Sequence, residues 1–98
     1  MKYKLEVKHE AFLDIKEAYL YYESRKKGLG KRFIETLEIY IDRIQKYPEH
    51  YQIKRNPYRE VFIKDFPYLI IFEIENKSVI VYAVFNTWRN PGSKPSKK

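Results

Sequence analysis

Five basic side chains lie in or beside segments that are predicted below to form strands: Lys54, Arg55, Arg59, Lys64 and Arg89. Metal-free RNA cleavage needs a base for the 2′-hydroxyl, cations for the crowded phosphorane and an acid for the leaving oxygen. Arginine supplies only the cation, because its pKa above about 12 keeps it protonated. Proton transfer would fall to Lys54 or Lys64 with a lowered pKa, or to a tyrosine such as Tyr68. The alternative for each base is a solvated charge on an exposed strand face.

Other catalytic and binding chemistries find little support in the residue types. The chain has no cysteine, which excludes disulfides, thiolate catalysis and cysteine-based zinc sites. His9 and His50 are isolated, and the glycine-rich segment 28–31 does not follow a predicted strand, so it indicates a turn and not a phosphate loop. The serines fall in predicted turns or the tail and form no nucleophilic triad. We therefore expect no metal and no cofactor.

Length and charge describe one basic domain. The chain has 98 residues and a formal charge of +7, and 44% of it is hydrophobic. We expect a single domain over residues 1–90 and a basic, disordered tail over residues 91–98. From Phe85 onward the bases are Arg89, Lys94, Lys97 and Lys98, without any acid. This pattern suits a polyanion or an acidic protein partner, and a merely solubilising tail is the alternative.

The N-terminal segment argues for a cytoplasmic protein. Residues 1–6 alternate charged and apolar side chains, so they lack the apolar run of a secretory signal. No stretch approaches the roughly 18 apolar residues that a membrane span requires. We expect cytoplasmic localisation and no membrane partner.

Hydrophobic periodicity predicts a strand and a helical hairpin in the first half. Tyr3, Leu5 and Val7 alternate with charged residues, which predicts a short strand with one buried face. An amphipathic helix is indicated next by the apolar stripe Phe12, Ile15, Tyr19 and Tyr22. Lys26–Gly30 suits a tight turn. A second helix carries the stripe Phe33, Leu37, Tyr40, Ile41 and Ile44, and Pro48 closes it near Tyr47.

Beyond Pro48 the period changes to that of strands. Strand signals cover residues 51–54, 61–63, 68–74 and 79–85, with a hairpin turn at Asn76-Lys77. The predicted class is α+β, in which an N-terminal strand and an antiparallel helical hairpin precede a three- to four-stranded antiparallel meander. The helices should cover one face of the sheet. The other face is expected to be aromatic and basic, with half-exposed tyrosines at Tyr58, Tyr68 and Tyr82.

Several local signatures, taken in order, resemble the RelE/ParE superfamily of type II toxins over nearly the whole chain. In the first half, Ala11–Ile15 resembles the opening helix of the family, Leu29–Phe33 its helix junction, and Tyr47-Pro48 its helix-ending proline. The second half matches more strongly, through the segments Tyr58–Val61, Phe66–Tyr68, Val81–Phe85 and Arg89–Pro91.

The resemblance implies a growth-inhibiting toxin that is neutralised by a cognate antitoxin, whose flexible segment wraps the toxin across its sheet and helices. RelE-like members cut mRNA on the ribosome, whereas ParE-like members poison DNA gyrase. Here Asn86 stands where the family commonly has histidine, and Phe72 where a tyrosine is frequent. Asparagine cannot act as a general acid or base at neutral pH. These departures favour a ParE-like toxin that is not a nuclease.

Three functions remain open at this point. In the favoured one, a protein target or the antitoxin is bound by Arg55, Tyr68, Trp88 and Arg89, and Arg59 supports the sheet edge. The second is a ribosome-dependent endoribonuclease with Lys54, Arg59, Lys64 and Arg89 in its site. The third is a degenerate, non-toxic module that binds an antitoxin. An acidic antitoxin also suits the charge of +7.

Overall fold

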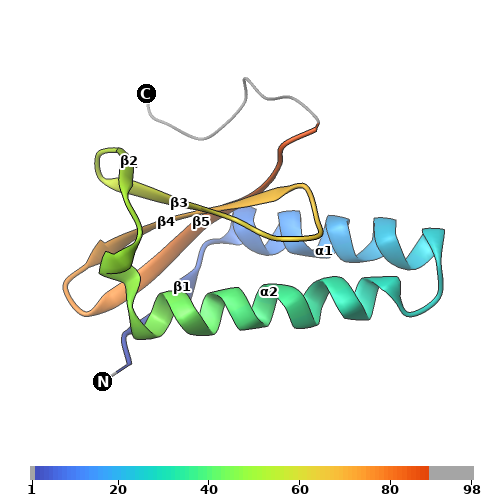
Figure 1. Cartoon of the computed structure of the whole chain (residues 1–98), viewed down its shortest axis with the longest axis horizontal. Helices are drawn as coiled ribbons and strands as arrows, with labels where there is room; N and C mark the ends of the chain where they lie inside the picture. The colour runs from blue at the N-terminus through green and yellow to red at the C-terminus, as the bar shows by residue number, and fades with distance from the viewer. Residues whose placement is uncertain (1, 89–98) are drawn as a thin grey trace.

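The computed structural model describes residues 2–88 and contains two long helices and a single sheet. Figure 1 shows the helices side by side in opposite directions, with the strands crossing above them. Along the chain the elements are β1 (Lys4–Val7), α1 (His9–Arg25), α2 (Leu29–Lys46), the short 3-10 helix η1 (Pro48–His50), β2 (Ile53–Arg55), β3 (Tyr58–Phe62), β4 (Tyr68–Glu75) and β5 (Ser78–Asn86). The predicted α+β class and order of elements are confirmed.

The turn between the helices is fixed by a side chain of α1. Gly28 has a φ of 90°, a left-handed conformation that glycine adopts without steric cost. Both oxygens of the Glu23 carboxylate accept hydrogen bonds from backbone N–H groups, one from Gly28 and one from Gly30, each at 2.9 Å. Glu23 therefore satisfies donors that the start of α2 leaves without a partner inside the helix.

The two helices pack through different kinds of residue. The predicted stripe of α2 is confirmed at its centre, because Phe33, Leu37 and Ile44 are buried. The stripe predicted for α1 is partly wrong. Its buried residues are Ala11 and Ala18, whereas Phe12 is 56% exposed. Small side chains on this face let the helix approach the sheet closely, and that displaces the larger residues to the flanks.

The sheet has the strand order β1-β5-β4-β3-β2. Strands β2 to β5 form the predicted antiparallel meander. The first strand closes the sheet differently, because β1 pairs in parallel with β5 over Lys4–Val7 and Ser78–Val81. The buried face predicted for it is wrong, since all four residues of this edge strand are exposed.

The two faces of the sheet carry separate apolar clusters. Phe72, Val79 and Val81 belong to the core that the helices cover, while Leu69, Ile71 and Ala83 form a smaller cluster with Tyr58 and Phe85. A register shift at Ile71/Phe72 leaves Tyr82 as an extra residue between the paired positions of β5, which makes a β-bulge. Burial on both faces of β4 and β5 agrees with the prediction for the central strands.

The face away from the helices is aromatic, as predicted, and it carries acids as well as bases. The Tyr82 ring meets that of Tyr58 edge-on, with centroids 5.2 Å apart, and its hydroxyl donates to Glu73 at 3.3 Å. Glu60 opposes Ile71 in the register and so shares this face. Carboxylates thus accompany the rings together with two bases, since Arg55 pairs with Tyr58 and the Lys8 Nζ lies 5.9 Å from the centre of the Tyr82 ring. Tyr68 was expected to be half-exposed here, yet it is only 4% exposed and belongs to the core under the helices.

Candidate functional site

The described bases do not converge on one site. Lys54 and Arg55 lie on β2, and Arg55 pairs with Tyr58 at the start of β3. Lys64 lies beyond the other end of β3, where Phe62 pairs with Leu69. In Figure 1 the β2–β3 turn and the β3–β4 connection lie at opposite ends of the sheet. Lys54 and Lys64 therefore lie apart, and their joint place in a nuclease site stays a prediction. Arg89 lies outside the described residues.

Arg59 faces the helical side of the sheet, because it pairs with the buried Phe72. Its guanidinium donates a hydrogen bond to the backbone carbonyl of Tyr51. The pKa of Tyr3 is raised, chiefly by burial and secondarily by the Glu49 carboxylate. The positive charge of Arg59 lies close enough to Tyr3 to oppose this rise. In this position Arg59 ties the segment after α2 to the sheet.

Lys64 lies in the exposed connection that follows β3. Its backbone N–H donates to the hydroxyl of Tyr40, at 3.0 Å, and so fastens this connection to α2. This hydrogen bond involves the backbone of Lys64 and not its ammonium group. A proton-transfer role for Lys54 or Lys64 stays a prediction.

A hollow of about 220 Å³ lies where α1 meets the ends of β4 and β5. It is lined by one carboxylate, four aromatic side chains and two further residues: Glu17, Tyr21, Tyr22, Pro67, Tyr68, Asn86 and Trp88. The Tyr22 ring packs 5.0 Å from that of Phe66 and 6.2 Å from that of Tyr68, between centroids. Burial is the main cause that raises the pKa of Tyr22 to about 12, and Tyr68 adds to it. The Tyr22 phenol is thus neutral at physiological pH.

Asn86 uses both ends of its amide within this hollow. Its Nδ2 donates to the Tyr68 hydroxyl at 3.2 Å, and its Oδ1 accepts from the backbone N–H of Trp88 at 2.9 Å. This side chain, at the position where histidine was expected by resemblance, therefore orders the end of β5. Trp88 itself is 82% exposed, so its ring is not folded under cover at the sheet end.

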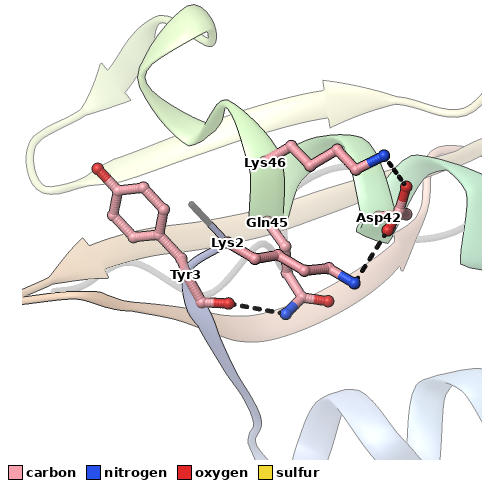
Figure 2. Close-up of polar contacts among 5 residues, drawn as sticks. All are labelled: Lys2, Tyr3, Asp42, Gln45 and Lys46. Atoms are coloured by element: carbon pink, nitrogen blue, oxygen red, sulfur yellow. Dashed lines mark hydrogen bonds and ion pairs between the residues drawn. The ribbon is translucent and has the colours of Figure 1, made fainter.

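A second, apolar groove lies between β1 and the helices. Its walls come from β1, α1 and α2: Leu5, Ile15, Ile34, Leu37, Glu38, Ile41, Asp42 and Gln45. Figure 2 shows the contacts that hold the segment before β1 against α2. Asp42 lies between Lys2 and Lys46 and forms an ion pair with each, at 3.2 Å. The Gln45 amide donates to the Tyr3 carbonyl at 2.8 Å. Sequence reasoning missed this groove because its apolar residues have the spacing of ordinary core stripes.

Metal and membrane sites find no structural support within residues 2–88. This segment holds no group of three His, Cys, Asp or Glu side chains that suits a metal ion. Neither of its long helices is apolar enough over a sufficient length to cross a bilayer.

Comparison with known proteins places the chain in a toxin family. A family model described as "ParE toxin of type II toxin-antitoxin system, parDE" matches residues 5–91. Among solved structures, a chain of the chromosomal ParDE TA system from P. aeruginosa superposes with a TM-score of 0.77. That chain is 11% identical, and the match covers 87% of the present chain and 96% of the other. At this low sequence identity the superposition shows a shared fold and nothing further. None of the curated proteins matches the chain.

Proposed function

The chain belongs to the ParE family of toxins of type II toxin–antitoxin systems, and on this premise we propose that it arrests growth by binding an essential protein target. DNA gyrase is the target that we favour, because ParE-like members of the superfamily poison it. The proposal also includes a cytoplasmic location and a cognate acidic antitoxin that neutralises the toxin. The alternatives are ribosome-dependent mRNA cleavage and a non-toxic antitoxin-binding module.

The distance between the bases is the observation that favours a toxin that acts by binding over a toxin that cleaves RNA. General acid–base catalysis requires the donor and the acceptor within hydrogen-bond reach of the same substrate. Lys54 and Lys64 lie at opposite ends of β3, and Arg59 is bound to the Tyr51 carbonyl. Glu60 and Glu73 on the outer face would repel an RNA phosphate. These placements favour a toxin that acts through a protein surface.

We assign contact with the target to the end of β5. Trp88 is the most exposed large apolar side chain of the described residues, and aromatic anchors of this kind dominate binding energy at interfaces. Arg89 follows it in the chain. Arg55 lies at the opposite end of the sheet and is assigned to the acidic antitoxin. Tyr68 is buried, so its part in binding is to shape the hollow beneath Trp88.

The apolar groove is the natural place for the antitoxin. Leu5, Ile34 and Ile41 present apolar surface there, and a partner that orders on binding needs such surface to offset its loss of conformational entropy. The toxin charge of +7 complements an acidic chain and speeds the encounter.

The test is induction of the full chain in cells, with and without the neighbouring open reading frame. We expect growth arrest with covalent gyrase–DNA complexes, measured by immunocapture of gyrase and sequencing of the attached DNA. Co-expression of a short acidic neighbour should restore growth. A Lys54→Ala, Lys64→Ala double variant should remain toxic, because neither lysine takes part in this mechanism.

Two results would contradict the proposal. Cuts at codon-specific positions in mRNA, lost in the double lysine variant, would identify an endoribonuclease. Normal growth with a soluble, folded protein at the level of a toxic control would identify a module without toxicity.

A further inference from the structure

The end of the helical hairpin carries a dense cluster of positive charge. Five exposed bases there form what we call the basic tip: Arg25, Lys26, Lys27, Lys31 and Arg32. Residues 18–34 contain these five bases and one acid, Glu23, which gives the segment a formal charge of +4 within a chain of +7. Figure 1 shows the turn between α1 and α2 projecting beyond the strands at one end of the molecule. The basic tip is therefore open to a large partner.

The single acid of this segment does not pair with the basic tip. Both oxygens of the Glu23 carboxylate accept backbone hydrogen bonds, from Gly28 and Gly30. The bond from Gly28 is the largest cause that lowers the pKa of Glu23, so this carboxyl is ionised and held at the start of α2. No ion pair within residues 2–88 includes a base of the tip. Its positive charge is thus open to a negatively charged partner.

Two of the five bases occupy positions that helix stability does not favour. The N–H groups at the start of a helix carry partial positive charge, so acids are stabilising in the first turn and bases in the last. Arg25 follows this rule in the last turn of α1. The first turn of α2 has no acid and carries Lys31 and Arg32 instead. Departures from a local rule of this kind are expected at functional positions.

The backbone of the tip is held in one conformation. The N–H of Leu29 donates to the Lys26 carbonyl at 2.9 Å, and the N–H of Arg32 donates to the Gly28 carbonyl at 3.1 Å. Because the backbone is fixed before any partner arrives, binding has to order only the side chains and costs less conformational entropy.

The composition of the tip fits phosphate groups better than a protein surface. Protein interfaces place aromatic and apolar residues at their centre and contain few lysines. No large apolar side chain is exposed within residues 22–38, and three of the five bases are lysines. Contacts with the backbone of nucleic acids are made chiefly by lysine and arginine.

The arrangement of the tip favours a DNA duplex among the nucleic acids. Proteins that bind single strands stack the bases on aromatic rings, but Tyr21, which adjoins the tip, has the Arg25 guanidinium 5.1 Å from its ring centre. Packed helices lie about 8–10 Å apart, and the major groove of B-DNA is about 12 Å wide. Bases on two neighbouring helix ends can therefore face phosphates on both sides of that groove. The major groove of duplex RNA is too narrow for this arrangement.

We propose that the basic tip binds the phosphate backbone of duplex DNA, with the bases of α1 and those of α2 on opposite sides of a groove. The contact reads no sequence, because phosphates carry no information about the bases. It adds a nucleic-acid contact to the proposed function and does not depend on it. Trp88, which we assign to the protein target, lines a hollow together with Tyr21, about one helical turn before Arg25. A target that acts on DNA could thus be bound together with its DNA.

The test measures binding of the purified full-length protein to a short fluorescent DNA duplex, by anisotropy at several salt concentrations. Two double variants each remove two bases of the tip, Lys26→Gln with Lys27→Gln and Lys31→Gln with Arg32→Gln. Each should raise the Kd about tenfold or more and reduce the slope of log K against log salt by about two. The matched control is Lys54→Gln with Lys77→Gln, which removes the same charge from β2 and the β4–β5 turn, at the other end of the molecule (Figure 1). It should keep most of the affinity.

Thermal unfolding separates weak binding from loss of structure. The Lys31→Gln, Arg32→Gln variant should not have a lower melting temperature than wild type, because it removes bases from the positive end of α2. Weaker binding by a protein of unchanged stability identifies charges that serve a partner.

Four results would overturn the proposal. They are an unchanged Kd in both tip variants, an equal loss of affinity in the control, competition by polyglutamate as strong as that by duplex DNA, and tighter binding of single strands or duplex RNA of the same sequence. Polyglutamate competition would assign the tip to an acidic protein, and RNA preference would assign it to RNA. Growth arrest without gyrase–DNA complexes would contradict the proposed function alone, because the binding assay contains neither gyrase nor cells.

Discussion

Asp14 continues the row of hydrogen bonds along β5 beyond the point where β1 ends. The strand pairs with β5 only as far as Val81, and the N–H of Lys8 donates to the Val81 carbonyl. Further along β5, the N–H of Val84 donates to the Asp14 carboxylate at 3.0 Å. A side chain of α1 thus takes the place of a missing strand. Burial raises the pKa of Asp14, although the hydrogen bond from Val84 opposes the rise.

Two substitutions of Asp14 distinguish the role of its hydrogen-bond acceptor from the role of its negative charge. Asp14→Ala leaves the Val84 N–H without its partner and is expected to lower the free energy of unfolding by about 1–3 kcal/mol. Asp14→Asn keeps an acceptor oxygen and should retain most of the stability. The raised pKa means that the wild-type contribution is full below the unfolded pKa and declines as pH rises through the folded one. Urea denaturation between pH 3 and 7 measures both effects. Equal losses in the two variants would contradict this role.

Two tyrosines provide a signature at alkaline pH. Burial is the first cause that raises the pKa of both Tyr22 and Tyr82 to about 12, and the Glu73 carboxylate adds to it at Tyr82. Because the fold favours the neutral phenols, their contribution to stability is complete below about pH 10 and is lost between pH 10 and 12. Absorbance at 295 nm should show a late phase of tyrosinate formation. The Tyr22→Phe, Tyr82→Phe double variant should lack most of that phase, while Tyr47→Phe, at an exposed position, should keep it.

Among the elements, the helical hairpin depends on one close approach. A Cβ added at Gly30 would lie 2.7 Å from the Tyr19 carbonyl oxygen and 2.9 Å from a carboxylate oxygen of Glu23. Gly30→Ala should therefore push the helices apart and lower the free energy of unfolding by about 1–3 kcal/mol, although alanine favours helices intrinsically. Lys31→Ala, at the next and exposed position of α2, is the control and should change stability little. Thermal unfolding followed by circular dichroism measures the difference, and a Gly30→Ala variant as stable as wild type would contradict the packing argument.

The elements also show where sequence periodicity succeeds. The α2 stripe was predictable because large apolar residues face the core, as Phe33 and Ile44 do. In α1 the buried positions are Ala11 and Ala18, whose small size carries little periodic signal. The parallel partner of β1 was not predictable, because the pairing joins residues more than seventy positions apart and no local pattern encodes it.

The candidate site was predictable only in part. Trp88 was predicted to bind the target or the antitoxin, and it does line the hollow. Glu17 and Tyr21 were missed because their nearness to Trp88 arises from the packing of α1 on β5. Their spacing of four residues on one helix is the available signal, yet it is also typical of an ordinary solvent-exposed face. The separation of Lys54 from Lys64 was not predictable, because the bulk charge says nothing about which end of a strand each residue occupies.

At the scale of the molecule, exposed apolar side chains lie on opposite sides of the sheet. Leu5 lines the groove beside the helices and is 40% exposed, while Phe62 is 68% exposed and pairs with Leu69 of the outer cluster. Assignment of the groove to the antitoxin predicts that apolar contacts on the first side matter for neutralisation and that Phe62 on the second side does not.

Leu5→Glu and Phe62→Glu make the matched pair for that prediction. Leu5→Glu removes apolar contact worth about 1.5–3 kcal/mol and places a negative charge against an acidic partner, so the Kd for the antitoxin should rise at least about tenfold. Phe62→Glu introduces the same charge on the other face and should leave the Kd near that of wild type. Isothermal titration calorimetry with the purified antitoxin compares them, and the reverse ranking would place the antitoxin on the outer face.

The parallel pairing of β1 with β5 also governs when the chain can acquire its structure. Within residues 2–88, residues 4–7 have their only strand neighbour at residues 78–81, and the Asp14 carboxylate of α1 accepts a hydrogen bond from the Val84 N–H. During synthesis, which proceeds at about 5–20 residues per second, the first strand and helix cannot dock until residues 78–84 have emerged. Pairing between residues so far apart in the sequence slows folding. A product that ends before residue 78 therefore lacks the strand on which β1 docks, and the strand edge of its β4 is left without a partner.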